Sequence, residues 1–217
     1  TSTAGLSALK TVSISGSAGL KADLSGATVT SVSASGTSGS NSVTIDANKA
    51  TFTGGTGADT VTLAATAPVK AIDLGAGNDS LDITAATAVT TANIVGGTGT
   101  DTLKMTAALA ATASATSSFG GLVSGFESLV LTGSTNQTID LKVLGNYNNV
   151  TTSAGNGLTL NNLPSTGTLV LNGAGTAYTV ANSDFTSGTS DSINLTLTDG
   201  SGFGVAFAST GITAANV

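Results

Sequence analysis

The sequence predicts an all-β fold, a right-handed parallel β-helix or β-roll solenoid with one short helical insertion. Two patterns predict it: a glycine-rich motif recurs about every 20 residues, and short segments that alternate apolar and polar residues flank each copy. Composition is the third observation, because only 4% of the residues are aromatic while 29 are glycine. The core must therefore be thin and aliphatic, which suits stacked small layers.

The glycine-rich motif fits the nonapeptide G-G-x-G-x-D-x-U-x, in which U is a large apolar residue. A weaker fourth copy, GTSGSNSVT at 36–44, has Asn41 in place of the aspartate. Leu74 replaces the first glycine in the middle one of the three full copies, so that loop is expected to be distorted. The three full copies are GGTGADTVT (54–62), LGAGNDSLD (74–82) and GGTGTDTLK (96–104).

The spacing of the motifs predicts about one solenoid rung per repeat. Asn41, Asp59, Asp79 and Asp101 follow one another at intervals of 18, 20 and 22 residues. Apolar residues stand two and four positions after each of them, and a further one stands seven positions before each aspartate. Each rung therefore has two short strands with one apolar face each, closed by stacking rung on rung. These apolar residues are Val43, Ile45, Val61, Leu63, Leu81, Ile83, Leu103 and Met105, with Phe52, Ile72 and Ile94 before the aspartates.

The two strands of a rung are joined on one side by the glycine loop and on the other by a turn of small residues, such as 64–69 or 85–91. Outside the motif block the strand rhythm continues, with glycine turns that lack the aspartate. These further strand-like segments are 11–14, 20–25, 29–34, 127–131, 137–143, 149–152, 158–163, 168–171, 177–180, 192–198 and 203–207.

Three regions are expected along the chain. Residues 1–105 form a β-solenoid that carries the glycine loops within 36–104. Residues 106–126 form a helical or loop insertion, because the alanine-rich run that opens it breaks the strand period and favours a short helix. That insertion either covers a side of the solenoid or protrudes to bind a partner. Residues 127–217 continue the solenoid, or form a β-rich extension, without such loops.

The loop residues predict a site for a hard cation. Glycines at motif positions one, two and four permit positive φ and let carbonyl oxygens turn inward. Adjacent rungs lie roughly 4.8 Å apart, so Asp59, Asp79 and Asp101 are expected to form a column of like charges that raises its own pKa values. A divalent cation between two loops removes this repulsion. All-oxygen ligands in a flexible loop favour Ca²⁺ over Mg²⁺ and Zn²⁺.

We therefore expect at least two Ca²⁺ ions, one between the Asp59 and Asp79 turns and one between the Asp79 and Asp101 turns. Asn41 keeps one oxygen without a charge and is a candidate for a third, weaker site. Asp73 is either an extra ligand or a strand-surface residue. Metal-free glycine turns are the alternative to calcium binding. The expected backbone-carbonyl ligands are those of Gly55, Gly57, Gly75, Gly77, Gly97 and Gly99.

Composition argues against several classes of function. The net charge is −6 and there is no histidine or cysteine, which disfavours nucleic-acid binding, thiolate metal sites and imidazole catalysis. Apolar runs are shorter than about 18 residues, so no membrane insertion is expected. The acidic residues outside the motifs are scattered and only Tyr147 and Tyr178 are tyrosines, so no catalytic residues and no enzyme activity are expected.

At the nonapeptides, GGTGADTVT and GGTGTDTLK above all, the sequence resembles the RTX (repeats-in-toxin) proteins. The likeness is close over 54–104 and looser over 36–104. The wider texture, with the phrase FGGLVSGFESLVLTG at 119–133, is similar to type-I-secreted bacterial S-layer proteins. Two departures are that a glycine loop stands on only one side of each coil, and that Leu74 interrupts one motif.

The resemblance implies a structural segment of a secreted protein of the cell surface, in which calcium stabilises the fold and drives lattice assembly by self-association. It leaves open a contact with lipopolysaccharide through other parts of the parent protein. A segment of a large RTX adhesin that binds a surface or glycan is the alternative. The chain does not begin with Met, which indicates an internal segment. Its widely spaced lysines are expected to solubilise the surface: Lys10, Lys21, Lys49, Lys70, Lys104 and Lys142.

Overall fold

The computed structural model of the chain describes residues 8–26, 28–133, 136–152, 157–172, 178–181, 192–197 and 205–207. It is a parallel β-solenoid with few helices, which confirms the predicted fold class. The chain forms two compact units, Thr1–Lys104 with Gly121–Phe126, and Met105–Gly120 with Glu127–Val217. Among the described residues, no helix has the length and hydrophobicity needed to cross a membrane.

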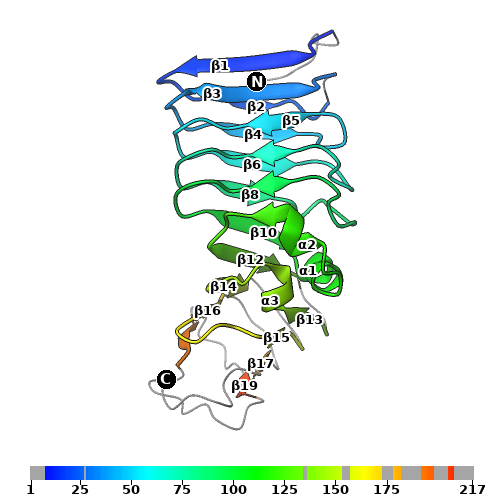
Figure 1. Ribbon diagram of the computed structural model, residues 1–217, viewed down its shortest axis with the longest axis vertical. Helices are drawn as coiled ribbons and strands as arrows, with labels where there is room; N and C mark the ends of the chain where they lie inside the picture. Colours follow the sequence, from blue (N-terminus) through cyan, green and yellow to red (C-terminus); the bar gives the residue numbers. More distant parts are fainter. Residues whose placement is uncertain are drawn as a thin grey trace. The chain divides into compact units, whose positions relative to one another are not determined.

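In the first unit each turn of the chain adds one strand to each of two parallel sheets, and Figure 1 shows these rungs stacked from β1 downward. One sheet has the order β1 (Thr11–Gly16), β3 (Ser31–Thr37), β5 (Thr51–Thr53), β7 (Ile72–Asp73), β9 (Ile94–Val95) and β11 (Val123–Ser124). The other has the order β2 (Lys21–Asp23), β4 (Ser42–Ile45), β6 (Thr60–Leu63), β8 (Ser80–Asp82) and β10 (Thr102–Thr106), of which 102–104 belong to this unit.

The core of this unit is a set of apolar ladders in the predicted register. Phe52, Ile72 and Ile94 are aligned across β5, β7 and β9. Val43, Val61, Leu81 and Leu103 are aligned across β4, β6, β8 and β10. All seven side chains are buried. Successive side chains of a strand point to opposite faces, so the period-two pattern places one apolar row inside each sheet.

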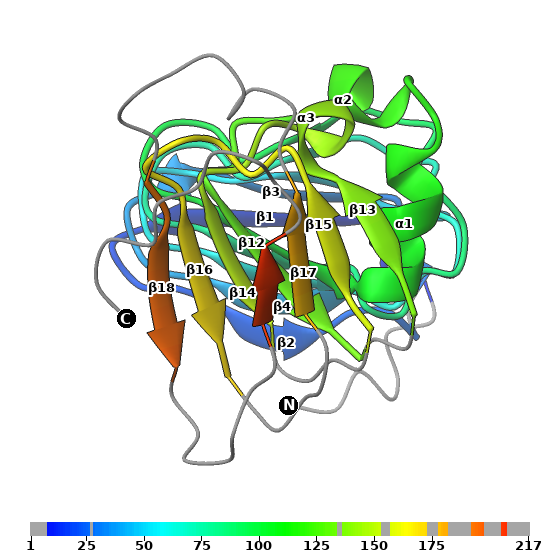
Figure 2. The same ribbon diagram turned by 90° about the horizontal axis from the view of Figure 1, so that it is seen from below.

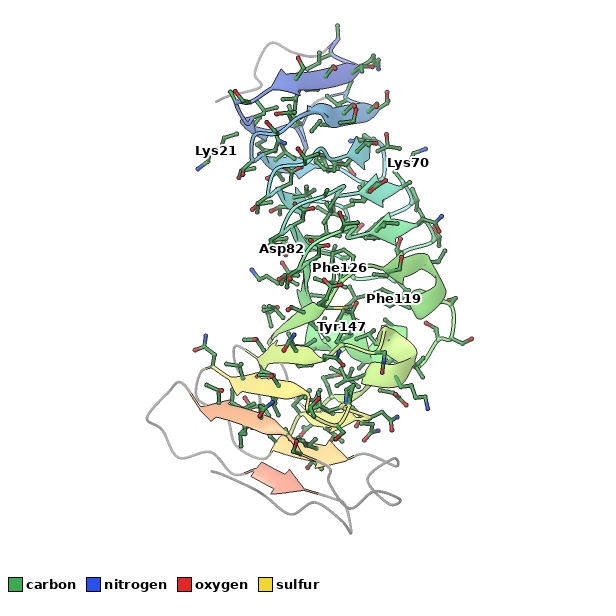
Figure 3. The ribbon with its side chains drawn as sticks, turned by 60° about the vertical axis from the view of Figure 1, so that its left-hand side comes forward. Lys21, Lys70, Asp82, Phe119, Phe126 and Tyr147 are labelled. Carbon is green, nitrogen blue, oxygen red and sulfur yellow. The ribbon has the colours of Figure 1, made fainter. Side chains whose placement is uncertain are left out.

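The alternate positions form a polar outer face on the second sheet. Thr44, Thr62, Asp82 and Lys104 are aligned there, and Lys104 Nζ lies 2.8 Å from Asp82 Oδ2. Figure 3 shows Asp82 on this face. Lys21, on the same sheet, also projects into solvent in Figure 3.

The second unit has the same parallel construction. One sheet has the order β12 (Ser128–Thr132), β14 (Asn149–Thr152), β16 (Thr168–Leu171) and β18 (Asn194–Leu197). The other has the order β13 (Thr138–Asp140), β15 (Thr159–Asn161), β17 (Tyr178–Ala181) and β19 (Val205–Phe207). The strand rhythm that the sequence shows after residue 127 therefore does build parallel sheets.

Helices cover one edge of the second unit. The alanine-rich segment forms α1 (Ala107–Ser114), whose first turn is capped by Thr106 Oγ1 accepting the Leu109 N–H at 3.1 Å. Figure 2 shows α1 beside the edge strand β13, with which it is in contact. The short helix α2 (Phe119–Leu122) follows α1 in the chain.

One strand prediction needs correction. Residues 141–143 were expected to continue the strand of 137–143, but they lie in α3 (Leu141–Leu144). The physical reason is Asp140, whose Oδ1 accepts the N–H groups of Lys142 at 3.0 Å and Val143 at 3.3 Å. This carboxylate satisfies donors that a helix start leaves without intrahelical partners, so the chain turns into a helix there.

Candidate metal centre

The predicted site residues lie in the loops that join the two sheets of the first unit. Asn41, Asp59, Asp79 and Asp101 are each the last loop residue before a strand of the second sheet. Because those strands are in register, the four side chains stack one above another. All four are buried, with at most 2% of their surface exposed. We refer to Asp59, Asp79 and Asp101 as the aspartate column.

One oxygen of each stacked side chain accepts the backbone N–H one rung earlier. Leu20 N donates to Asn41 Oδ1 at 2.9 Å, and Asn41 N donates to Asp59 Oδ1 at 2.8 Å. Asp59 N then donates to Asp79 Oδ1 at 2.6 Å, and Asp79 N to Asp101 Oδ1 at 2.7 Å. Sequence reasoning missed this role, although the Asn/Asp spacing of about one rung is a signal from which it could be found.

In two members of the column, Asp59 and Asp79, the other carboxylate oxygen has no such partner in the part of the chain that the structure describes. Among the described residues, the buried Oδ2 atoms of Asp59 and Asp79 have no hydrogen-bond partner. Burial raises the pKa of Asp79 to about 6; the hydrogen bond from the Asp59 N–H opposes the rise, and the charges of Asp101 and Asp59 add to it. A buried carboxylate oxygen without a donor is costly, so a positive charge beside these oxygens would stabilise the folded state.

The first glycine of a loop is needed for close approach rather than for positive φ. A Cβ on Gly54 would lie 1.8 Å from the Leu74 carbonyl oxygen and 3.1 Å from Asp59 Oδ2. A Cβ on Gly96 would lie 1.8 Å from the Gly125 carbonyl oxygen. The expectation of positive φ at all three motif glycines is therefore wrong at position one, where φ lies outside the left-handed range. Leu74 is tolerated at this position with its side chain fully buried in the core.

Positive φ does occur at positions two and four of the two later motifs, in Gly75, Gly77, Gly97 and Gly99. Gly55 and Gly57 of the earliest full motif do not have positive φ, so the expectation is wrong there as well. A Cβ at these positions would meet the backbone of the preceding rung, 2.1 Å from Thr37 O and 2.6 Å from Gly39 O.

Two of the predicted carbonyl ligands bond to the next rung. Gly55 O accepts the Ala76 N–H at 2.8 Å, and Gly75 O accepts the Thr98 N–H at 3.0 Å. A carbonyl oxygen has two lone pairs, so each keeps one for a further donor or a cation.

The structure places the two remaining candidates differently. Asn41 uses both ends of its amide on the protein, since Nδ2 donates to Asp59 Oδ1 at 2.8 Å and to Gly39 O at 3.2 Å while Oδ1 accepts from Leu20. Asp73 lies exposed on the outer face of β7, and its Oδ1 accepts the Gly75 N–H at 3.1 Å. The structure thus groups Asn41 with the column and leaves Asp73 outside it.

The donor set fits a hard cation. The orphaned Oδ2 atoms of Asp59 and Asp79 are carboxylate oxygens, and the glycine loops offer backbone carbonyl oxygens; both are ligand types that Ca²⁺ takes. Within the described part of the chain, no group of three or more His, Cys, Asp or Glu side chains could hold a metal ion. An ion here would be held by carboxylates of neighbouring rungs together with loop carbonyls.

Comparison with known proteins adds no relative: no family model, no curated protein and no solved structure matches the chain. The resemblance to RTX proteins therefore stays a prediction that rests on the nonapeptides.

Proposed function

We propose that this chain is a structural segment of a secreted bacterial surface-layer protein, in which calcium stabilises the solenoid by neutralising the aspartate column. The observation that carries the proposal is the pair of buried Oδ2 atoms, in Asp59 and Asp79, that have no hydrogen-bond partner in the described part of the chain. A cation between rungs would supply the missing charge at the place where stacking creates the repulsion.

The burial of the column supports a structural role over a catalytic one. Asp59, Asp79 and Asp101 expose at most 2% of their surface, so their carboxylates cannot reach a substrate in solution. Their charge acts on the free energy of folding instead. Any ligand that binds only the folded state stabilises it by mass action.

Calcium coupling also suits export. Without calcium, at neutral pH, Asp79 has to hold its charge in a buried position beside Asp101 and Asp59, which weakens the folded state. Outside the cell, where calcium is plentiful, the folded state gains the binding free energy. We propose that the folded segments then associate with copies of themselves at the cell surface. In the alternative function, an adhesin segment, the calcium-stabilised fold is the same but binds a surface or glycan instead.

Urea unfolding followed by far-UV circular dichroism tests the calcium part of the proposal. We expect the midpoint to rise in CaCl₂ relative to EDTA, and to rise much less in the same concentration of MgCl₂. Equal midpoints in CaCl₂ and EDTA refute it. Electron microscopy after calcium addition tests assembly: ordered sheets support a surface layer, whereas dispersed monomers that bind glycans support an adhesin segment.

A further inference from the structure

Asn41 occupies the position that an aspartate holds in the three following rungs, but its hydrogen bonds differ from theirs. Its Nδ2 is a donor, and it reaches Asp59 Oδ1 at 2.8 Å, the same oxygen that the Asn41 backbone N–H reaches at 2.8 Å. Asp59 Oδ1 therefore accepts two N–H groups from one residue. An aspartate at position 41 could supply only the backbone donor.

The other side of Asn41 is satisfied as well. Its Oδ1 accepts the Leu20 N–H at 2.9 Å, and its Nδ2 also lies 3.2 Å from Gly39 O. The side chain is 2% exposed, so these bonds form out of contact with water. The neutral amide of Asn41 thus has two roles. Its oxygen accepts a backbone N–H of the preceding rung, as the aspartate oxygens do, and its Nδ2 gives Asp59 a donor without adding a negative charge.

We infer that Asn41 is the neutral cap of the aspartate column: its amide takes the place of a cation next to Asp59, so that calcium enters only between Asp59, Asp79 and Asp101. The ion count rests on the proposed function, whereas the capping role does not. Replacing the amide by a carboxylate removes a donor and adds a like charge beside Asp59. The column would then be longer by one carboxylate and have room for one more ion.

The test compares wild type with Asn41→Asp, Asn41→Ala and the matched control Asn48→Asp. Asn48 lies exposed in the turn after β4, so its replacement makes the same charge change away from the column. Isothermal titration with CaCl₂ counts the ions bound per chain. We expect two for wild type, Asn41→Ala and Asn48→Asp, and three for Asn41→Asp.

Measurements in EDTA test the cap without any ion. We expect Asn41→Asp and Asn41→Ala to unfold at lower urea than wild type, and Asn48→Asp to unfold with wild type. Hydrogen exchange at the Leu20 amide separates the two variants. Asn41→Ala removes its acceptor and speeds exchange about tenfold, while Asn41→Asp retains an acceptor oxygen and the protection.

The outcomes distinguish the proposed calcium-binding function from the role of Asn41 as the neutral cap. A wild type that binds no calcium refutes the proposed function and the ion count with it. A wild type that binds two ions while Asn41→Asp also binds two overturns the ion-limiting role alone. Asn41 variants that match wild type in EDTA, in both urea midpoint and Leu20 exchange, overturn the cap itself. If Asn41→Asp does not fold in EDTA, that loss supports the cap, and its ion count is taken in calcium.

Discussion

The central aspartate offers the sharpest test of the electrostatics, through the isosteric change Asp79→Asn. The variant keeps an oxygen that can accept the Asp59 N–H, which in the wild type lies 2.6 Å from Asp79 Oδ1. The same arrangement already exists two rungs earlier in the stack, where Asn41 Nδ2 donates to Asp59 Oδ1 at 2.8 Å. In Asp79→Asn the same geometry lets Nδ2 donate to Asp101. The change therefore replaces a buried charge by a satisfied amide.

The size of the effect follows from the pKa of Asp79, which burial, with the charges of Asp101 and Asp59, raises from an ordinary 3.8 to about 6. The folded state holds the Asp79 proton more tightly than the unfolded state does. The stabilisation that this proton gives is therefore fully present below pH 3.8 and is lost as the pH rises through about 6. One pKa unit is worth about 1.4 kcal/mol, so the metal-free wild type loses at most about 3 kcal/mol by pH 7. Subtracting about 1 kcal/mol for a weaker hydrogen bond to a neutral acceptor leaves Asp79→Asn about 1 to 2 kcal/mol more stable.

The assay is urea unfolding in EDTA between pH 4 and pH 8, analysed by linear extrapolation. The free-energy difference between variant and wild type should grow with pH up to about 7. Aspartates with lowered pKa, such as Asp23 and Asp82, act equally in both proteins and cancel in the difference. The matched control is Asp73→Asn, an exposed aspartate of the same rung, which should show no such growth.

In calcium, the wild type should become more stable than Asp79→Asn. Asp79 is the carboxylate that both expected ions share, so Asp79→Asn should lose most of the calcium-induced rise in unfolding free energy, which for wild type is about 2.7 kcal/mol per site at a hundredfold excess over Kd. An Asp79→Asn protein that is less stable than wild type in EDTA at pH 7 contradicts the reasoning, because it shows that the buried charge was already satisfied.

Three further predictions concern the close approach of the rungs, the apolar core and one ion pair, and a fourth substitution serves as a control. Gly54→Ala should lower the thermal midpoint by many degrees, since its Cβ would lie 1.8 Å from a backbone carbonyl oxygen of the next rung, whereas Gly121→Ala, where a Cβ meets nothing within 4 Å, should leave it unchanged. Leu81→Ala, at a fully buried site, should cost about 2 to 5 kcal/mol in urea unfolding, and a cost under about 1 kcal/mol would argue against the core as described. Lys104→Met breaks the partly exposed ion pair with Asp82 and should cost less than about 1 kcal/mol, an effect that 1 M NaCl should weaken in the same assay.

The sequence by itself determined the strands that follow the glycine motifs and the face that each of them buries. Alternation of apolar and polar residues places Val61 and Leu81 inside and Thr62 and Asp82 outside, because side chains of a strand alternate between faces. The near-constant spacing of the aspartates also determined the column, since residues one rung apart must stack in a parallel solenoid.

Only the tertiary structure decided what each polar atom bonds to. Partners in the column lie 18 to 22 residues apart, and their pairing depends on the register between rungs, which a local pattern does not encode. That register gives one oxygen of each aspartate to a backbone N–H, commits the Asn41 amide to Asp59, and leaves Asp73 on the outer surface. It also shows why Gly54 has no side chain, because the backbone of the next rung already fills that space.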